Sequence, residues 1–467
     1  MDLSNKSLNR IKKIIPRRLF KFFQPAYHYL LSALSAFLYA FPSERLIVIG
    51  VTGTTGKTTS VYLIAKTLEA AGFKTGFTST AMFNDGEREW LNDKKMTMVG
   101  RFFTQKMLSR MVRNGCRFAI VETTSEGVRQ FRHRFINYDL LVFTGLYPEH
   151  IESHGGFENY KAAKGRLFAH LQRCKAKFVD EKKTVHKDAS GLRKTELQKI
   201  KKTIIANLND EHAGYFLDFW AEEKFAYLNP HEPFVSIPPK VKVIKFEDVQ
   251  VSAAGTSFKV EGRRMTLQLL GGFNAANAMN AILVGFSQGI DFDTLKKGLE
   301  NISGVAGRLE RISEGQPYTV IVDYAFEPKA VAKLYEAVKV IPHKKIIHVL
   351  GSTGGGRDVS RRPVLGGLAG RNSQLVIVTN EDPYDEDPEV IIGQVAAGAE
   401  LAGKKLNQDL FRIPDRREAI AQALSSASQG DVVLITGKGS EQAICAADGE
   451  MIPWDDRAVV RGMLSNK

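Results

Sequence analysis

The sequence predicts an α/β protein in which two units of sheet and helix follow a short helical N-terminal extension. Apolar, strand-like runs alternate with helix-like segments along most of the chain, which is typical of largely parallel sheets. The stretch 301–307 interrupts this alternation as a predicted hinge, and the alternation then restarts. A length of 467 residues with 43% hydrophobic content exceeds one ordinary core, so two or three domains are expected.

The N-terminal extension begins with basic residues and continues with an uncharged run. This run, residues 22–43, contains no Asp, Glu, Lys or Arg. This run is long enough to span a bilayer, but Pro25, His28 and three serines dilute it. Basic residues before the run would also keep the N-terminus in the cytoplasm and send the rest outside. No small-residue site for signal-peptide cleavage follows. We therefore expect residues 1–43 to lie on an anionic membrane surface as an interfacial helix, or to pack on the next domain.

A phosphate-binding loop is predicted between an apolar strand at 46–49 and a helix at 60–71. Glycines let backbone N–H groups approach an anion, and the helix N-terminus adds the positive end of its dipole. Lys57 would reach terminal phosphates and Thr58 would bind Mg²⁺. Val51 replaces a glycine of the strict pattern, and an ordinary Gly-Thr turn is the alternative. The predicted loop residues are Gly53, Thr54, Thr55, Gly56, Lys57, Thr58 and Thr59.

Further elements follow in order. In the first unit, residues 117–121 and 140–144 are predicted strands, and residues 159–171 and 272–289 are predicted helices. The second unit has predicted strands at 319–322, 345–350, 374–379 and 432–436, which alternate with helices.

Charge and cysteine usage narrow the class of protein. The formal net charge is +14, but the basic residues gather before residue 22 and between 175 and 202 without interleaved aromatics. This distribution favours anionic small substrates or a membrane surface over nucleic acid. Cys116, Cys174 and Cys445 show no C-x-x-C spacing, which indicates neither a disulfide framework nor structural zinc and favours a reducing cytoplasm.

Several motifs follow the loop in a fixed order. Together with residues 50–59, they resemble the Mur ligases, ATP-dependent enzymes that add amino acids to the peptidoglycan precursor, and in particular their MurE branch. The resemblance covers residues 46–460, and an ordered set is far more specific than a single motif. The motifs are Val121-Glu122-Thr123-Thr124-Ser125, Glu149-His150, His154-Gly155-Gly156, Asn159 to Lys164, Phe273-Asn274 with Asn277, Gly307-Arg308-Leu309-Glu310, Asp323-Tyr324-Ala325, Gly437-Lys438-Gly439 and Asp455-Asp456-Arg457.

The resemblance implies a domain organisation. Residues 1–45 would be the basic and apolar extension, residues 46–305 a P-loop ATPase-like central domain, and residues 306–467 a Rossmann-like domain that binds the amino acid. MurE-type enzymes normally begin with a full uridine-binding domain, for which 45 residues leave no room.

The implied chemistry is peptide-bond formation driven by ATP. A carboxylate takes the γ-phosphoryl group to become an acyl phosphate, and an incoming amine then expels phosphate. By resemblance, the catalytic residues are Lys57, Glu122, His150 and Lys164. Glu122 and His150 would hold a second Mg²⁺, supported by Lys164 as a carbamate. Without the resemblance, His150 would be an ordinary loop histidine and Lys164 a solvated helix lysine.

The resemblance also assigns contacts to the nucleotide. Asn274 and Asn277 lie one helical turn apart and would contact adenine. Arg308 would contact phosphate after domain closure, and Asp323 would lie near the ribose. Closure would exclude water and protect the acyl phosphate from hydrolysis.

The predicted amino-acid site departs from the family pattern. The family segment D-N-P-R appears here as Glu381 to Tyr384, without the arginine that would receive a second carboxylate. The acidic neighbourhood favours lysine over meso-diaminopimelate, although a solvated acidic loop is an equally ordinary explanation. The segments D-Y-A-H-T-P and G-K-G-H-E also lack their histidines. The site residues implied here are Glu381, Asp382, Tyr384, Gly437 and Glu441.

The expected function is ligation of an amino acid to a UDP-N-acetylmuramyl dipeptide by a cytoplasmic monomer whose partners are small molecules. ATP and Mg²⁺ are the expected cofactors, and nucleic acid is not an expected partner. One alternative is an amide ligase of the same fold that resembles folylpolyglutamate synthase. The other is a noncatalytic, membrane-associated subunit that binds ATP.

Overall fold

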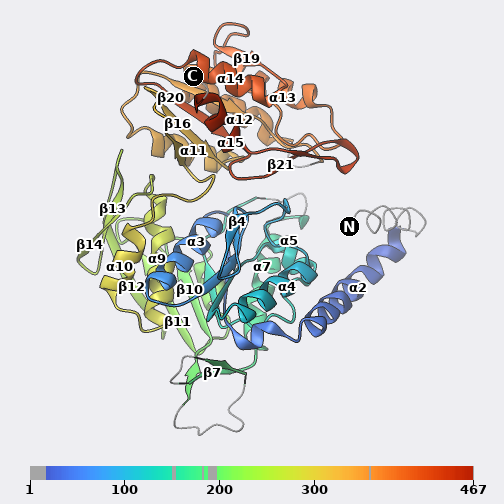
Figure 1. Cartoon of the computed structure of the whole chain (residues 1–467), viewed down its shortest axis with the longest axis vertical. Coiled ribbons are helices and arrows are strands. Elements are labelled where there is room, and N and C mark those ends of the chain that lie inside the picture. The colour runs from blue at the N-terminus through green and yellow to red at the C-terminus, as the bar shows by residue number, and fades with distance from the viewer. Residues whose placement is uncertain (1–16, 150–153, 181–183, 188–196, 357–358, 466–467) are drawn as a thin grey trace.

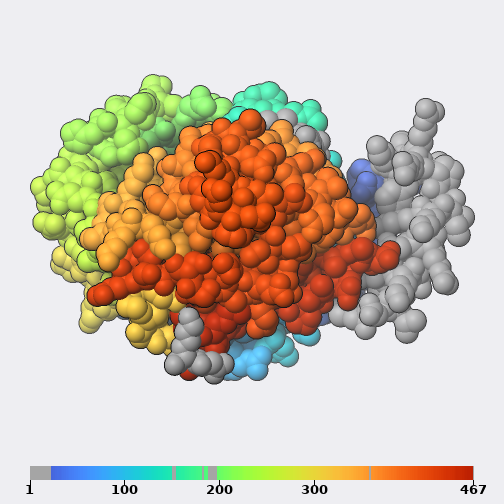
Figure 2. Space-filling view, turned by 90° about the horizontal axis from the view of Figure 1, so that it is seen from above, coloured from blue at the N-terminus to red at the C-terminus, as the bar shows by residue number. Residues whose placement is uncertain are grey.

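The computed structural model describes residues 17–149, 154–180, 184–187, 197–356 and 359–465. Figure 1 shows two bodies stacked along the long axis, with one helix along the side of the first body. Seen from above, the C-terminal body covers the central one, and part of the N-terminal helix emerges at the side (Figure 2). The predicted α/β class with a helical extension is confirmed.

The central body is built on an eleven-stranded sheet of order β14-β13-β12-β11-β10-β6-β1-β5-β2-β3-β4. The strands from β2 to β12 in this order pair in parallel, whereas both edges are antiparallel. The strands are β1 Ile47–Thr52, β2 Thr75–Thr78, β3 Met82–Asn84, β4 Glu89–Leu91, β5 Phe118–Glu122, β6 Leu140–Phe143, β10 Thr203–Asn207, β11 Glu223–Leu228, β12 Lys242–Ser252, β13 Gly255–Val260 and β14 Arg263–Leu267.

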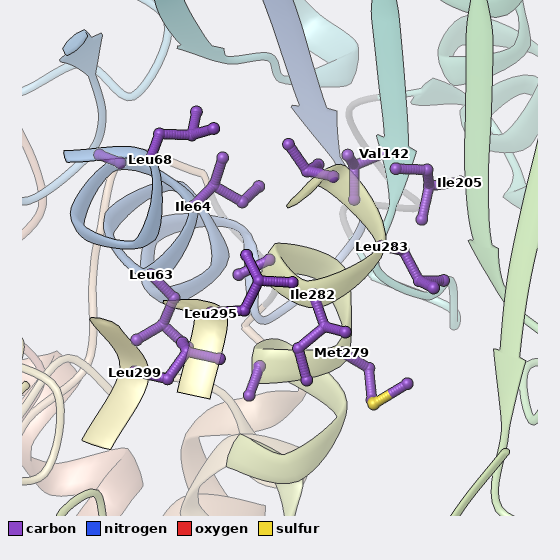
Figure 3. Close-up of a cluster of buried hydrophobic side chains, with 14 of the residues drawn as sticks. Leu63, Ile64, Leu68, Val142, Ile205, Met279, Ile282, Leu283, Leu295 and Leu299 are labelled. Atoms are coloured by element: carbon purple, nitrogen blue, oxygen red, sulfur yellow. The ribbon is translucent and has the colours of Figure 1, made fainter. Parts of the chain in front are cut away.

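Helices cover both faces of this sheet, and each interface holds its own apolar cluster. Figure 3 shows one cluster, in which side chains of α3, α9 and α10 meet Val142 and Ile205 of the sheet. Every residue of β1 is buried, as expected for a central strand covered on both sides. The helices are α3 Lys57–Ala70, α9 Phe273–Ser287 and α10 Phe292–Glu300 on one face, and α4 Arg101–Arg113, α5 Ser125–Arg129, α7 Phe157–Leu171 and α8 Ala213–Leu217 on the other.

The C-terminal body has a six-stranded sheet of order β15-β16-β20-β17-β18-β19, in which only β15 runs antiparallel to its neighbour. Its strands are β15 Glu310–Ile312, β16 Thr319–Asp323, β17 Ile346–Leu350, β18 Leu375–Val378, β19 Leu410–Arg412 and β20 Val432–Thr436. Its helices are α11 Pro328–Val338, α12 Arg361–Asn372 and α13 Pro388–Leu401 on one face, and α14 Arg416–Ser426 and α15 Asp456–Ser465 on the other.

The predicted strands and helices are all present, with ends that differ by a few residues. The largest shifts are of three residues: β1 runs to Thr52 instead of ending at residue 49, and α3 begins at Lys57 instead of residue 60 because the helix starts directly at the loop. The antiparallel edge strands were not predicted. They follow from the short turns between β12, β13 and β14, which allow only antiparallel pairing. Two small sheets complete the fold: β7 Lys177–Val179 with β8 Val185–His186 and β9 Gln198–Ile200, and β21 Ala443–Cys445 with β22 Met451–Pro453.

The N-terminal extension forms helix α2, Arg17–Leu38, which contains Pro25 and leads through a 3₁₀ turn, Pro42–Arg45, into β1. It packs beside α4 and the turn that follows α5. Among the described residues, no helix has the length and apolar character needed to cross a membrane. The basic residues before Arg17 lie outside the described residues.

Part of the predicted basic cluster between 175 and 202 is internal. Lys177 and Lys202 are buried and place their ammonium groups 2.5 and 2.8 Å from the two carboxylate oxygens of Asp139. These two charges therefore serve the core and do not form a surface for an anionic partner.

Candidate active site

The predicted phosphate loop joins β1 to α3 and is held from several sides. The Thr54 amide donates to the Gly145 carbonyl at 2.8 Å, and the Lys57 ammonium donates to the Thr54 carbonyl at 2.8 Å. Gly56 has a φ of 78°, and a Cβ there would lie 2.5 Å from Oδ1 of Asn277 on α9. Glycine is therefore required for both conformation and space. The loop presents the first N–H groups of α3, the arrangement that suits a phosphate.

Thr58 and Glu122 meet beside this loop, since β1 and β5 pair in parallel and place Glu122 opposite Val51. The Thr58 hydroxyl donates to the Glu122 carboxylate at 3.0 Å, and both side chains are buried. The amide and hydroxyl of Thr80 donate to the same carboxylate at 2.8 and 3.0 Å. A hydroxyl and a carboxylate are hard oxygen ligands, so this pair fits Mg²⁺. Sequence reasoning missed Thr80, which carries no motif.

Lys164, on α7, points at the loop from the opposite side. Its ammonium donates to the Gly53 carbonyl at 2.8 Å and lies 4.6 Å from the centre of the Tyr160 ring. The side chain is buried, so the reading as a solvated helix lysine is wrong. Burial, with a smaller contribution from the neighbouring Lys57 charge, holds the pKa of Lys164 well below its ordinary value. A neutral amine is nucleophilic, which is the state that addition to carbon dioxide requires.

His150 lies outside the described residues, so its role stays a prediction. The segment before it is tied to the loop and to the C-terminal domain. The Tyr147 amide donates to the Thr54 hydroxyl at 3.2 Å, and the Tyr147 hydroxyl donates to Glu327 at 2.6 Å. Within the described ranges, no three side chains among His, Cys, Asp and Glu form a metal-binding group. The predicted second Mg²⁺ site thus depends on His150 and on a carbamate at Lys164.

Asn274 and Asn277 lie together at the start of α9. The Asn277 amide donates to Asn274 Oδ1 at 2.9 Å, and Asn274 donates to the Leu270 carbonyl at 2.8 Å. Because Asn277 also lies against Gly56, the structure brings this pair next to the phosphate loop. Their contact with adenine remains a prediction.

Arg308 crosses from the C-terminal domain to the loop. Its Nη2 donates to the Thr58 hydroxyl at 3.2 Å, and its guanidinium lies 4.4 Å from the centre of the Tyr324 ring. The carboxylate of Asp323 accepts from the amides of Leu309 and Ala325 at 2.7 and 2.6 Å. Asp323 therefore shapes the turn that holds Arg308, in addition to any contact with ribose.

The predicted amino-acid site contains two ammonium groups and two carboxylates. The buried Lys438 ammonium lies 2.9 Å from Asp382 and 2.8 Å from Glu441. Lys95, from the central domain, reaches the same two carboxylates at 2.6 and 2.5 Å. Sequence reasoning missed Lys95. This lysine lies in a loop between β4 and α4 that carries no motif, and its partners are 287 and 346 positions away in the sequence.

The other predicted residues of the amino-acid site, Glu381, Gly437 and Tyr384, differ in their burial and hydrogen bonding. Glu381 is buried, and burial raises its pKa to about 7. Within the described residues, its Oε2 atom has no hydrogen-bond partner, and a Cβ on Gly437 would lie 2.3 Å from that atom. Tyr384 has a φ of 52°, and its amide donates to the Cys445 carbonyl at 3.0 Å.

The acidic neighbourhood is only partly open, because Asp382 is buried and paired whereas Asp385 and Asp387 are exposed. Asp382 pairs with two lysines, the Glu386 carboxylate pairs with Arg362 at 2.8 Å, and Asp385 accepts from the Asp448 amide at 2.9 Å. An attraction for a cationic side chain thus cannot be inferred from the number of acidic residues alone.

Comparisons with known proteins agree with this geometry. Residues 51–285 match the Mur ligase middle domain, and residues 307–439 match the Mur ligase, glutamate ligase domain. A UDP-N-acetylmuramyl-tripeptide synthetase from Roseiflexus sp. (strain RS-1) is 37% identical over 93% of this chain and 82% of its own length. A UDP-N-acetylmuramoyl-L-alanyl-D-glutamate--2,6-diaminopimelate ligase from Geobacillus thermodenitrificans (strain NG80-2) is 32% identical over 92% of this chain and 81% of its own length.

A solved structure of a UDP-N-acetylmuramoyl-L-alanyl-D-glutamate--2,6-diaminopimelate ligase is similar over most of its length. It superposes with a TM-score of 0.57 at 25% identity and covers 95% of this chain and 83% of its own. The chain therefore belongs to the Mur ligase family, whose members are ATP-dependent amide ligases that add amino acids in peptidoglycan precursor synthesis.

Proposed function

We propose that this protein joins an amino acid to the free carboxylate of a UDP-N-acetylmuramyl dipeptide at the expense of ATP. The observation that carries the proposal is the convergence of Lys57, Glu122 and Lys164 on one phosphate loop. Three separate elements, α3, β5 and α7, supply these residues, so their meeting is specific to the folded chain. The similarity over 93% of the chain to a tripeptide synthetase favours this reaction over folate chemistry.

The reaction consists of two displacements. An oxygen of the acceptor carboxylate attacks the γ-phosphorus of ATP, and ADP leaves with the electrons of the broken P–O bond. The amine of the incoming amino acid then attacks the acyl carbon, loses a proton and expels phosphate. Lys57 and Arg308 would neutralise charge on the transferring phosphoryl group.

Thr58, Glu122, His150 and a carbamate on Lys164 would hold Mg²⁺, which supplies charge neutralisation at the phosphates when bound. The low pKa of Lys164 supports its modification, because the neutral amine can add to carbon dioxide and release a proton.

Contacts across the two domains support a closed arrangement for the reaction. Arg308 meets Thr58, Tyr147 meets Glu327, and Lys95 meets Asp382. Such closure would exclude water from the acyl phosphate. We place the boundary near residue 305, because α10 ends at Glu300 and β15 begins at Glu310. One chain supplies all of these groups, so a monomer would suffice for the reaction. We place this monomer in the cytoplasm.

The amino acid is proposed to be lysine. Tyr384 stands where an arginine would receive a second carboxylate, and the two lysines of the site, Lys95 and Lys438, are already paired with Asp382 and Glu441. An unpaired carboxylate of meso-diaminopimelate would be disfavoured in such surroundings.

Release of ADP by the purified protein tests the proposal. With UDP-N-acetylmuramyl dipeptide and ATP, release should depend on the amino acid and should match the peptide formed. Release that instead requires a folate and glutamate would favour the folylpolyglutamate alternative. The absence of release with every acceptor and amino acid would favour a noncatalytic ATP-binding subunit.

A further inference from the structure

Helix α2 packs on the protein with its small polar side. Ser32, Ser35 and Ala36 are buried on this side. The Ser32 hydroxyl donates to the Phe131 carbonyl at 3.0 Å, and Ser35 donates to the Ser32 carbonyl at 2.9 Å. Since large apolar side chains normally face the core, the burial of α2 is inverted relative to an ordinary surface helix.

Most of the large apolar side chains of α2 lie on the opposite side and are exposed, whereas Tyr29 packs against Phe131 and Phe135. The exposed fractions of the side chains on the opposite side run from 45% for Tyr27 to 70% for Phe37. The spacing of three and four positions places them in one stripe along the helix. Figure 1 shows α2 at the edge of the central domain, with α4 on its inner side. The stripe consists of Tyr27, Leu30, Leu34 and Phe37, with Leu38 beside it.

The sequence around the stripe carries positive charge only. Between Asp2 and Glu44 there is no acidic residue, whereas seven basic residues precede the stripe. Three of them fall in the first turns of α2. A second protein could cover an apolar stripe, but a strongly basic flank fits an anionic lipid surface on charge as well. The seven are Lys6, Arg10, Lys12, Lys13, Arg17, Arg18 and Lys21.

We propose that α2 lies in the plane of an anionic lipid bilayer, with the apolar stripe in the boundary between headgroups and acyl chains. The positive charge of the sequence before the stripe adds attraction to anionic headgroups, and the side of α2 that carries Ser32 stays packed on the central domain. The phosphate loop contributes nothing to this contact, so lipid binding and ligation are separable properties of the chain.

Flotation of the full chain with lipid vesicles tests the proposal. Vesicles of phosphatidylcholine alone are compared with an equimolar mixture of phosphatidylcholine and phosphatidylglycerol. Binding to the anionic vesicles is expected to exceed binding to the neutral ones by about tenfold or more, and to weaken as salt is raised.

The variant Leu30→Ser/Leu34→Ser/Phe37→Ser removes apolar groups that are already exposed, so it should fold normally, as circular dichroism would verify. It is expected to lose binding to anionic vesicles by at least about tenfold. The matched control, Phe234→Ser/Ile237→Ser/Leu401→Ser, removes similarly exposed apolar groups from other elements and should bind as the parent does. Turnover of soluble substrates should be unchanged in both variants.

Equal vesicle binding by the parent and the stripe variant would overturn the proposal. The proposal would also be overturned if neither chain bound vesicles and the parent formed a dimer in gel filtration that the stripe variant abolished. The stripe would then mediate self-association. Failure of ligation alone would leave this proposal standing, because flotation does not depend on turnover.

Discussion

The Lys95 ammonium of the central domain lies 2.6 Å from the Asp382 carboxylate of the C-terminal domain, and both side chains are almost fully buried. Lys95 adopts a φ of 50°, a left-handed backbone conformation that is uncommon for a residue other than glycine. The same ammonium meets Glu441, which Lys438 also contacts. One ion network therefore joins the two domains at the predicted amino-acid site.

Removal of Lys95 should weaken the closed arrangement. In Lys95→Met, the carboxylates of Asp382 and Glu441 share Lys438 as their remaining ion-pair partner among the described residues. Loss of one member of a buried pair commonly costs about 3–5 kcal/mol. We expect kcat to fall by about tenfold or more, with the KM for ATP nearly unchanged, since the phosphate loop is intact. Lys94→Met is the matched control, because Lys94 is exposed and forms a surface ion pair with Asp93. Equal kinetics for both variants would contradict a role for Lys95 in closure.

Lys57→Ala should abolish ligation and leave the fold intact. Lys57 is the first residue of α3 at the phosphate loop, where its ammonium donates to the Thr54 carbonyl. ADP release measures the activity, and circular dichroism measures the fold. Lys66→Ala, on the same helix with partners Glu69 and Glu89, should retain activity. Unchanged turnover in Lys57→Ala would refute the assignment of the phosphate loop.

Lys164→Ala should lose activity, and formate or acetate should restore part of it by replacing the missing anion beside the metal. Lys161→Ala provides the control, since Lys161 lies on the same helix but pairs with Glu158 at the surface. Rescue should be absent in the control because its activity is intact. Full activity of Lys164→Ala without added carboxylate would remove the carbamate hypothesis.

The buried Glu381 should lower stability as the pH rises. The pKa of Glu381 is about 7 in the folded chain, compared with a reference value of 4.5. Between pH 4.5 and pH 7 the folded chain therefore binds one more proton than the unfolded chain. The stabilisation is complete below pH 4.5 and is lost as the pH rises to 7. Over this window the parent should lose about 3 kcal/mol relative to Glu381→Gln. Urea unfolding of both chains at pH 5 and pH 8 measures the difference. A constant difference would show that Glu381 is not a buried neutral acid.

The kcat/KM for lysine should exceed that for meso-diaminopimelate by about ten- to hundredfold. This ratio corresponds to the free energy of one lost charge-assisted hydrogen bond. Tyr384→Arg should narrow that ratio by supplying a fork-shaped partner for the second carboxylate. Paired assays of the two amino acids decide the matter. A parent ratio in favour of meso-diaminopimelate would indicate that another cation, such as Lys95, receives the carboxylate.

Local pattern was sufficient for much of the fold and for one part of the site. The strand at β1, the glycines of the loop and the helix after it are close in sequence, and their periodicity and backbone requirements are properties of the local chain. The same holds for the strands and helices of the second unit. Glu122 and Lys164 were predicted through the resemblance of their motifs to the Mur ligases, and the structure places both beside the phosphate loop.

Tertiary structure alone decided the charge state and pairing of these residues. Lys164 looks like any helix lysine in sequence, and only packing against Gly53 and Tyr160 buries it. The apparent acidic cluster at Asp382 became a balanced network because Lys95 arrives from another domain. Sequence determines local backbone preference, whereas burial and ion pairing depend on which distant side chains share the same low-dielectric space, and that is settled only when the domains are assembled.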